Sequence, residues 1–294
     1  MTYHHKLSST LFIAALLGCP TVGLAYSDVY TADDEMTTHH DNLVEAVQNG
    51  KMGLQFRLRY EDAKQGSLKT AKATTLKSQL SYKTGTYSNL TGAVTLTDVT
   101  AFFGQKYNPE VKELSKPEFS TVRDPKGTGL TQAQVTFSGL DRTKINVGRQ
   151  AIKLDNERYL STLDFRQYPQ SFDAISLHNQ MIDDLSIYYA YAHHVNTPTA
   201  NGRTSEGRRK MNTHLLNIGW DAFLYGKLIG YVYMFKDKEQ TANSNVNIGA
   251  RLEATDDLRD SLEWDYQVEF EDNKFYGTPY EENEFISFEG VKDY

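Results

Sequence analysis

The stretch Met52-Gly-Leu-Gln-Phe-Arg-Leu-Arg-Tyr-Glu61 alternates apolar and polar residues with a period of two. Successive side chains of a β-strand point to opposite faces, so this stretch predicts a strand with one apolar and one charged face. A soluble sandwich also alternates, but strands that set Arg, Lys or Glu against Leu and Tyr are typical of a wall between lipid and water. The apolar face carries Leu54, Phe56, Leu58 and Tyr60, and the other face carries Gln55, Arg57, Arg59 and Glu61.

The same strand signals recur in ten further segments, which makes eleven predicted strands. Short connections alternate with long ones, as in barrels with short periplasmic turns and long outer loops. The sequence therefore predicts an all-β fold, a transmembrane antiparallel up-and-down β-barrel. Bacterial barrels have even strand numbers, so eleven indicates either a miscounted strand in a closed barrel or an incomplete barrel. The predicted strands are residues 52–61, 72–84, 90–103, 130–137, 143–150, 171–179, 185–195, 212–220, 227–235, 245–254 and 261–271.

The composition excludes several classes of protein. The chain has 294 residues and a net charge of -7, and this balance gives no global case for nucleic-acid binding. A mean hydropathy of -0.56 excludes a bundle of spanning helices, because each such helix needs about 20 consecutive apolar residues. The 19 tyrosines suit the aromatic girdles of membrane barrels. Tyrosine-rich strands also occur in secreted sugar-binding proteins, so composition alone leaves both classes open.

The N-terminus predicts a cleaved signal peptide over residues 1–25. Basic residues precede the apolar segment 11–17, and Gly23-Leu24-Ala25 offers small residues for cleavage. A lipoprotein signal at Cys19 is the competing interpretation, although the neighbouring residues fit that motif poorly; either signal exports the chain. Residues 26–50 predict a periplasmic lead-in with a short helix that Asp41 caps and Gly50 follows. The barrel domain is predicted over residues 51–294.

Several motifs resemble the alginate-export-type porins of Gram-negative outer membranes. The resemblance rests on the order and spacing of the motifs, and it extends from Gly50 to the hairpins around Trp220 and Gly230. It implies a large monomeric barrel, inserted by the barrel assembly machinery, with an Arg- and Lys-lined path for an anionic polysaccharide. The motifs are Gly50-Lys51, Arg57-Leu-Arg-Tyr-Glu61, Tyr82-Lys-Thr-Gly85, Asp124-Pro-Lys-Gly-Thr128, Gly148-Arg-Gln150, Asp155-Asn-Glu-Arg158, Phe165-Arg-Gln167 and Ser171-Phe-Asp-Ala174.

The C-terminal residues depart from this pattern. A barrel of this kind should end in an amphipathic strand with a terminal aromatic residue. Tyr294 is aromatic, but Gly290 and Lys292 occupy positions that should be apolar. An open sheet in lipid would leave unpaired backbone groups. Two interpretations stay open at this point: a truncated member of the family, or a smaller closed barrel.

Seven basic residues are the candidate lining of a solute path. Guanidinium groups bind carboxylates with two parallel hydrogen bonds, whereas lysines act as point charges. Residues 151–170 form a long connection that can fold into the pore as a constriction loop. The alternative is that these charges only hydrate the pore and pair with acidic groups, which Glu263, Asp265, Glu269 and Glu271 supply on one late strand. The candidates are Arg57, Arg59, Lys77, Lys83, Arg149, Arg158 and Arg166.

The sequence gives little support to an enzyme, a metal site or a cofactor. His193 and His194 are adjacent on a predicted strand and face opposite ways. Ser186 and His193 have opposite parity, so they fail as a same-strand catalytic pair. The prediction is an outer-membrane porin, in contact with outer-membrane lipid, for passive passage of small polar or anionic solutes. An anionic polysaccharide such as alginate is the candidate substrate. The alternatives are a non-conducting, adhesin-like surface barrel or truncated remnant, and a secreted soluble carbohydrate-binding β-protein.

Overall fold

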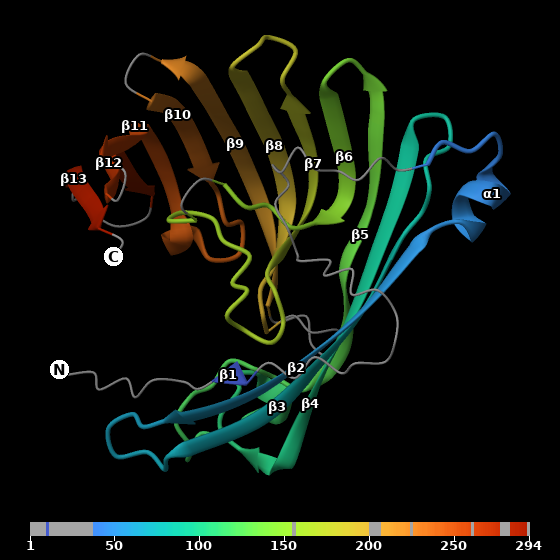
Figure 1. The fold of residues 1–294 in the computed structure, drawn as a ribbon. Helices are drawn as coiled ribbons and strands as arrows, with labels where there is room; N and C mark the ends of the chain where they lie inside the picture. The colour runs from blue at the N-terminus through green and yellow to red at the C-terminus, as the bar shows by residue number, and fades with distance from the viewer. Residues whose placement is uncertain are drawn as a thin grey trace. The chain divides into compact units, whose positions relative to one another are not determined.

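The computed structural model describes residues 10–11, 38–154, 157–199, 207–223, 226–259, 262–276 and 283–292. They form one sheet of 13 strands that follow one another in sequence order, and every pairing with a resolved register is antiparallel (Figure 1). The strands are β1 (Thr10–Leu11), β2 (Lys51–Ala63), β3 (Ala71–Lys83), β4 (Leu90–Lys106), β5 (Gly127–Leu140), β6 (Thr143–Gln150), β7 (Ser171–Asn179), β8 (Leu185–Asn196), β9 (Arg208–Phe223), β10 (Gly226–Phe235), β11 (Ser244–Arg259), β12 (Leu262–Tyr276) and β13 (Asn283–Lys292).

Strands β2 to β12 correspond to the eleven predicted segments, and several of them are a few residues longer than predicted. The sequence missed two strands. The first, β1, lies within the predicted signal peptide and pairs with β2 through Thr10 and Arg59. The second, β13, pairs with β12 along its whole length. It escaped prediction because Gly290 and Lys292 interrupt its alternation.

The predicted short helix is α1 (Leu43–Gln48), but its cap is Asn42 rather than Asp41. The Asn42 backbone is extended, and its side-chain oxygen accepts a hydrogen bond from the Glu45 amide at 2.8 Å. This is the geometry of an N-cap, which satisfies one of the free amides of the first turn. The helix contacts the turn after β3, because the Gly85 amide donates to the Ala46 carbonyl oxygen at 2.8 Å.

Two 3-10 helices complete the elements, η1 (Lys112–Leu114) and η2 (Thr241–Asn243). None of the helices in the described ranges is long and apolar enough to cross a membrane. The chain divides into two compact units. The first comprises Met1–Val135, Gly148–Asp173 and Val195–Arg209, and the second comprises Thr136–Val147, Ala174–His194 and Lys210–Tyr294.

The first unit has an inverted distribution of polar and apolar side chains. On β2, Leu54 and Phe56 remain 65% and 46% exposed, while Arg59 is only 8% exposed. On the neighbouring strands, Lys77 and Thr97 are buried in the same way. Isolated exposed leucines are ordinary in soluble proteins, but a continuous apolar face opposite a buried polar face is not. The strands therefore turn their apolar face outward, as predicted for a wall in contact with lipid.

The second unit repeats this inversion. Trp220 on β9 and Ile248 on β11 are 43% and 49% exposed. Asn217 on β9 and Arg251 on β11 are 8% and 2% exposed. The Asn217 amide donates a 2.7 Å hydrogen bond to the Tyr233 hydroxyl of β10, so buried polar groups meet one another across neighbouring strands. Both units thus have the alternation that distinguishes a membrane wall from a soluble sandwich.

The first unit contains a small apolar core. It consists of Ala71, Ala73, Tyr107 and Val122. The Tyr107 hydroxyl donates to the Asp124 carbonyl oxygen at 2.8 Å, and burial raises the pKa of this phenol above its ordinary value. The phenol therefore stays protonated and keeps donating at any physiological pH. This bond fixes Asp124 beside the candidate functional site.

Candidate functional site

Two predicted path residues face each other on the buried side of the first unit. Arg57 of β2 and Lys77 of β3 are directly opposed in the strand register, and Lys77 is only 9% exposed. Two positive charges therefore lie side by side and make the potential here positive. Like charges directly opposite on a sheet are destabilising. Lys83 lies at the other end of β3, opposite Lys51, and does not join this group.

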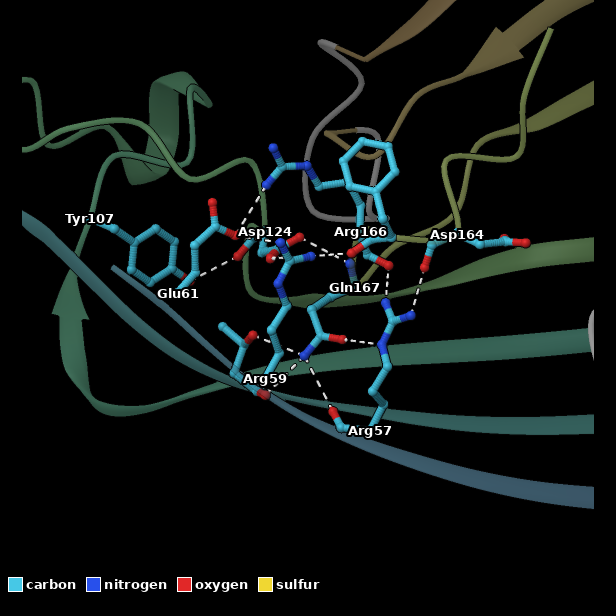
Figure 2. Close-up of polar contacts among 10 residues, drawn as sticks. Arg57, Arg59, Glu61, Tyr107, Asp124, Asp164, Arg166 and Gln167 are labelled. Atoms are coloured by element: carbon cyan, nitrogen blue, oxygen red, sulfur yellow. Dashed lines mark hydrogen bonds and ion pairs between the residues drawn. The ribbon is translucent and has the colours of Figure 1, made fainter. Parts of the chain in front are cut away.

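The long connection between β6 and β7 reaches Arg57 and Arg59 (Figure 2). Arg57 donates from Nη1 to the Asp164 carbonyl oxygen at 2.6 Å and from Nη2 to the Arg166 carbonyl oxygen. Arg59 donates from Nη1 to the carbonyl oxygen of Phe165. Three consecutive loop carbonyls therefore accept from two arginines of one strand. The predicted constriction loop lies against β2, and arginines that were predicted to face a solute hold the loop.

Arg59 differs from Arg57 because carboxylates surround it. Its Nη2 lies 2.5 Å from Glu61 Oε2, and its Nη1 lies 3.6 Å from Asp124 Oδ2. Arg166 also approaches Glu61, with Nη1 3.5 Å from Oε2, and its guanidinium lies 5.1 Å from the Phe165 ring. The charges of Arg59 and Arg166 are thus balanced locally by acidic groups.

Gln167 fixes the loop to both strands. It ends the motif Phe165-Arg-Gln167 that supports the resemblance, but it was not among the seven predicted path residues. Its side chain is completely buried. Its Nε2 donates to the Thr75 carbonyl oxygen at 2.8 Å and to the Arg57 carbonyl oxygen at 3.2 Å, while its Oε1 accepts from Arg57 Nε at 2.9 Å. Its backbone amide donates to Asp124 Oδ1 at 2.9 Å. The Gln167 side chain thus supplies polar groups of β2 and β3 with the hydrogen bonds that water would otherwise make.

Tyr168 follows Gln167 at the buried end of the loop. Its side chain is 1% exposed, and burial raises the pKa of this phenol to about 12. The Arg158 guanidinium lies 5.5 Å from the ring of the adjacent Tyr159. Of the seven predicted path residues, the structure brings together Arg57, Arg59, Lys77 and Arg166.

Arg149 belongs to a separate network at the loop bases. Its Nε and Nη2 lie 2.7 and 3.1 Å from the two oxygens of Asp173, which form a bidentate pair. The same carboxylate accepts from Arg208 Nη2 at 3.0 Å and from Asn196 Nδ2 at 3.1 Å. Arg149 has the parity of the apolar residues Ile145 and Val147, so its polar contacts require that the strand end there or that a bulge reverse its face. The preceding Gly148 has a φ of 122°, so the backbone is irregular at that point.

We expect Asp173→Asn to destabilise the protein by about 2–3 kcal/mol, because a charged acceptor of four hydrogen bonds is lost from the loop bases. The temperature at which the folded form converts to the unfolded form on gels should fall. The matched control is Asp183→Asn, which breaks an ion pair with Arg142 that is mostly exposed to solvent. Such surface pairs contribute little, so the control should leave the transition unchanged. If the two variants convert at the same temperature, Asp173 does not hold the loop bases together.

Other predicted features are tested only in part. The late acidic strand is present as β12, but the side chains of Glu263, Asp265, Glu269 and Glu271 lie outside the described residues. Among the residues that the structure describes, no three His, Cys, Asp or Glu side chains are grouped to hold a metal ion. Tyr189 donates or accepts a 2.8 Å hydrogen bond with His214 Nδ1 on the exposed face, where a catalytic pair would be open to lipid.

A family model for alginate export matches residues 49–283 of the chain. No curated protein matches the chain. Solved structures match over most of the chain. They include Acinetobacter baumannii OccAB1, with a TM-score of 0.60 at 14% identity, and a BenF-like porin from Pseudomonas fluorescens Pf-5, with 0.57 at 13%. Pseudomonas aeruginosa OpdL gives 0.51 at 18%. These similarities confirm the predicted barrel type of fold.

The matched porins are longer than this chain. The alignments cover 82%, 84% and 78% of the chain but only 55%, 64% and 57% of OccAB1, the BenF-like porin and OpdL. The chain therefore spans a little over half to almost two thirds of each porin. All of the strands that carry the site, from β2 to β9, lie inside the family match.

Proposed function

Because the chain belongs to the alginate export family, we propose that it forms an outer-membrane pore for passive passage of small polar or anionic solutes. An anionic polysaccharide such as alginate is the substrate class that we favour. The outer membrane is the proposed location, reached by export through the cleaved signal peptide 1–25 and insertion by the barrel assembly machinery. The domain division into residues 1–25, 26–50 and 51–294 is part of this proposal.

The inverted wall is the observation that carries the proposal. Exposed apolar side chains on β2, β4, β9 and β11 suit hydrocarbon, while the buried polar side chains suit a water-filled interior. A secreted soluble sugar-binding protein would expose this apolar surface to water at a cost of roughly 25 cal/mol per Å². The wall therefore favours a membrane barrel over the soluble alternative.

The basic group at the loop supports passage of anions. Arg57, Lys77, Arg59 and Arg166 bring four positive charges to the place where residues 164–167 lie against the wall. Rings of such side chains select anions, and several weak sites in series let a charged chain move on. The loop narrows the path at this point, and the arginines determine which solutes pass.

The test is conductance of the purified full chain in planar bilayers. We expect discrete channels whose reversal potential under a KCl gradient shows chloride preference, with partial block by mannuronate oligomers. Heating the sample before electrophoresis should change its mobility, because closed barrels resist detergent until heated. A folded, heat-modifiable barrel without channels would favour the non-conducting surface barrel. A chain recovered in soluble form without detergent would contradict the proposal outright.

A further inference from the structure

The hydrogen bonds of Arg57 are unusual for a half-buried guanidinium. All three of its acceptors are neutral oxygens, namely Gln167 Oε1 and the carbonyl oxygens of Asp164 and Arg166. Within the described ranges, Arg57 makes no ion pair with a carboxylate. Although Asp164 supplies a carbonyl, its side chain is exposed and extends away from Arg57 (Figure 2).

The surroundings increase this imbalance. Lys77 stands directly opposite Arg57 in the register and is 9% exposed, so a second positive charge shares the same space. The acidic side chains that act on Arg57 are Asp124 and Asp164. The Asp124 carboxylate lies 3.6 Å from Arg59 Nη1, and the Asp164 carboxylate is exposed. Glu61 pairs with Arg59 and Arg166. Among the residues that the structure describes, Arg59 therefore has carboxylates in ion-pair contact, whereas Arg57 and Lys77 have none.

We infer that Arg57 is a carboxylate-binding site that the loop occupies in the resting protein. The carbonyl oxygens of Asp164 and Arg166 accept from Nη1 and Nη2, the same two nitrogens that a carboxylate would engage with its two oxygens. A solute carboxylate brings the opposite charge that the loop carbonyls lack. When it binds Arg57, residues 164–167 leave the wall and the constriction widens. This inference rests on the proposed function and adds that the pore is opened by its own anionic solute.

The loop competes as a tethered ligand, which sets the expected concentration range. Short tethers give effective concentrations on the order of millimolar, so a free carboxylate should compete in that range. A monomeric uronate tests this directly. We use D-glucuronate as the probe and D-glucose as its neutral counterpart of the same ring size.

The Gln167 amide is a reporter of loop position that does not depend on conduction. It donates to Asp124 Oδ1 and lies on a completely buried residue, so its hydrogen exchange is slow while the loop is bound. Exchange mass spectrometry of the folded full chain should show faster exchange in the peptide containing Gln167 when millimolar D-glucuronate is added, and no change with D-glucose. A peptide over residues 84–92, which is hydrogen-bonded within its own turn, should not respond to either sugar.

Variants separate a binding site from a structural contact. In Arg57→Gln, the peptide containing Gln167 should exchange rapidly without any sugar, and D-glucuronate should not make its exchange faster. Arg123→Gln is the matched control, since it removes the same charge from an exposed pair with Glu110 in another loop and should keep the wild-type response. If wild-type exchange is the same in D-glucuronate and D-glucose, the inference is wrong, whether or not Arg57→Gln folds. Bilayer conductance is read separately, so a protein that conducts without loop release overturns only the inference. One that releases the loop without conducting overturns only the proposed function.

Discussion

Replacing Phe56 by arginine should prevent the chain from assembling in the outer membrane. Phe56 lies between Leu54 and Tyr60 among the exposed apolar residues of β2, and it is 46% exposed. A charge near the middle of the lipid-facing wall costs about 2–4 kcal/mol, and each strand depends on its neighbours for closure. Outer-membrane fractions should contain little of the heat-modifiable folded form, and the chain should accumulate as aggregate or be degraded.

The matched control adds the same charge one residue away. Gln55→Arg places the guanidinium on the polar face of β2, which also carries Arg57 two residues further along the strand. That face already carries basic residues, so folded protein should be recovered in amounts similar to wild type. If Phe56→Arg assembles as well as Gln55→Arg, the exposed apolar face does not contact lipid, and the membrane wall is wrong.

Replacing Gln167 by alanine should release the loop from the wall and raise single-channel conductance. The change removes the side-chain hydrogen bonds to Thr75 and Arg57 and leaves buried partners unsatisfied. At about 1 kcal/mol for each of these four bonds, the equilibrium between bound and released loop shifts by roughly 1,000-fold. Planar-bilayer recordings should show larger and noisier channels with the same ion preference, because the arginines remain.

Gln170→Ala provides the comparison within the same loop. Within the described residues, the Gln170 side chain donates to the Ser161 carbonyl oxygen alone, at 2.8 Å, so its bond lies within the loop and does not reach the wall. Its conductance should match wild type. Channels of equal size in the Gln167→Ala and wild-type proteins would show that the 151–170 loop does not narrow the path.

The wall of the barrel was predictable from the sequence because its physical signal is local. Alternation with period two is set by the two faces of each strand, and turn residues mark the ends. All eleven predicted segments are strands, and the family match confirms the resemblance. The helix cap was placed one residue early because Asp41 and Asn42 are both good capping residues, and only the backbone geometry decides between them.

The site was predictable only in its charges. The parity of Arg57, Arg59 and Lys77 placed them correctly on the polar face. Their partners could not be predicted, because Arg57 and Arg59 bind backbone carbonyls, which every residue possesses and no sequence pattern marks. The role of Gln167 was missed for a related reason, although the residue lies in a motif that supports the resemblance. One glutamine in a long loop has no periodicity, and its importance comes from contacts with residues about 90 to 110 positions away.

The inverted wall has a consequence for how such a chain changes over evolutionary time. Lipid is a fluid that fits any apolar shape, so an exposed residue such as Leu54 or Ile248 can drift among apolar types without a compensating change. Buried polar residues, such as Thr97 and Thr131 with hydroxyls 3.0 Å apart, must change together. The lipid-facing half of the residues in each strand is thus under weak selection for which apolar residue type is present. Relatives can keep the fold while losing recognisable similarity, which accounts for matches at 13% to 18% identity over most of the chain.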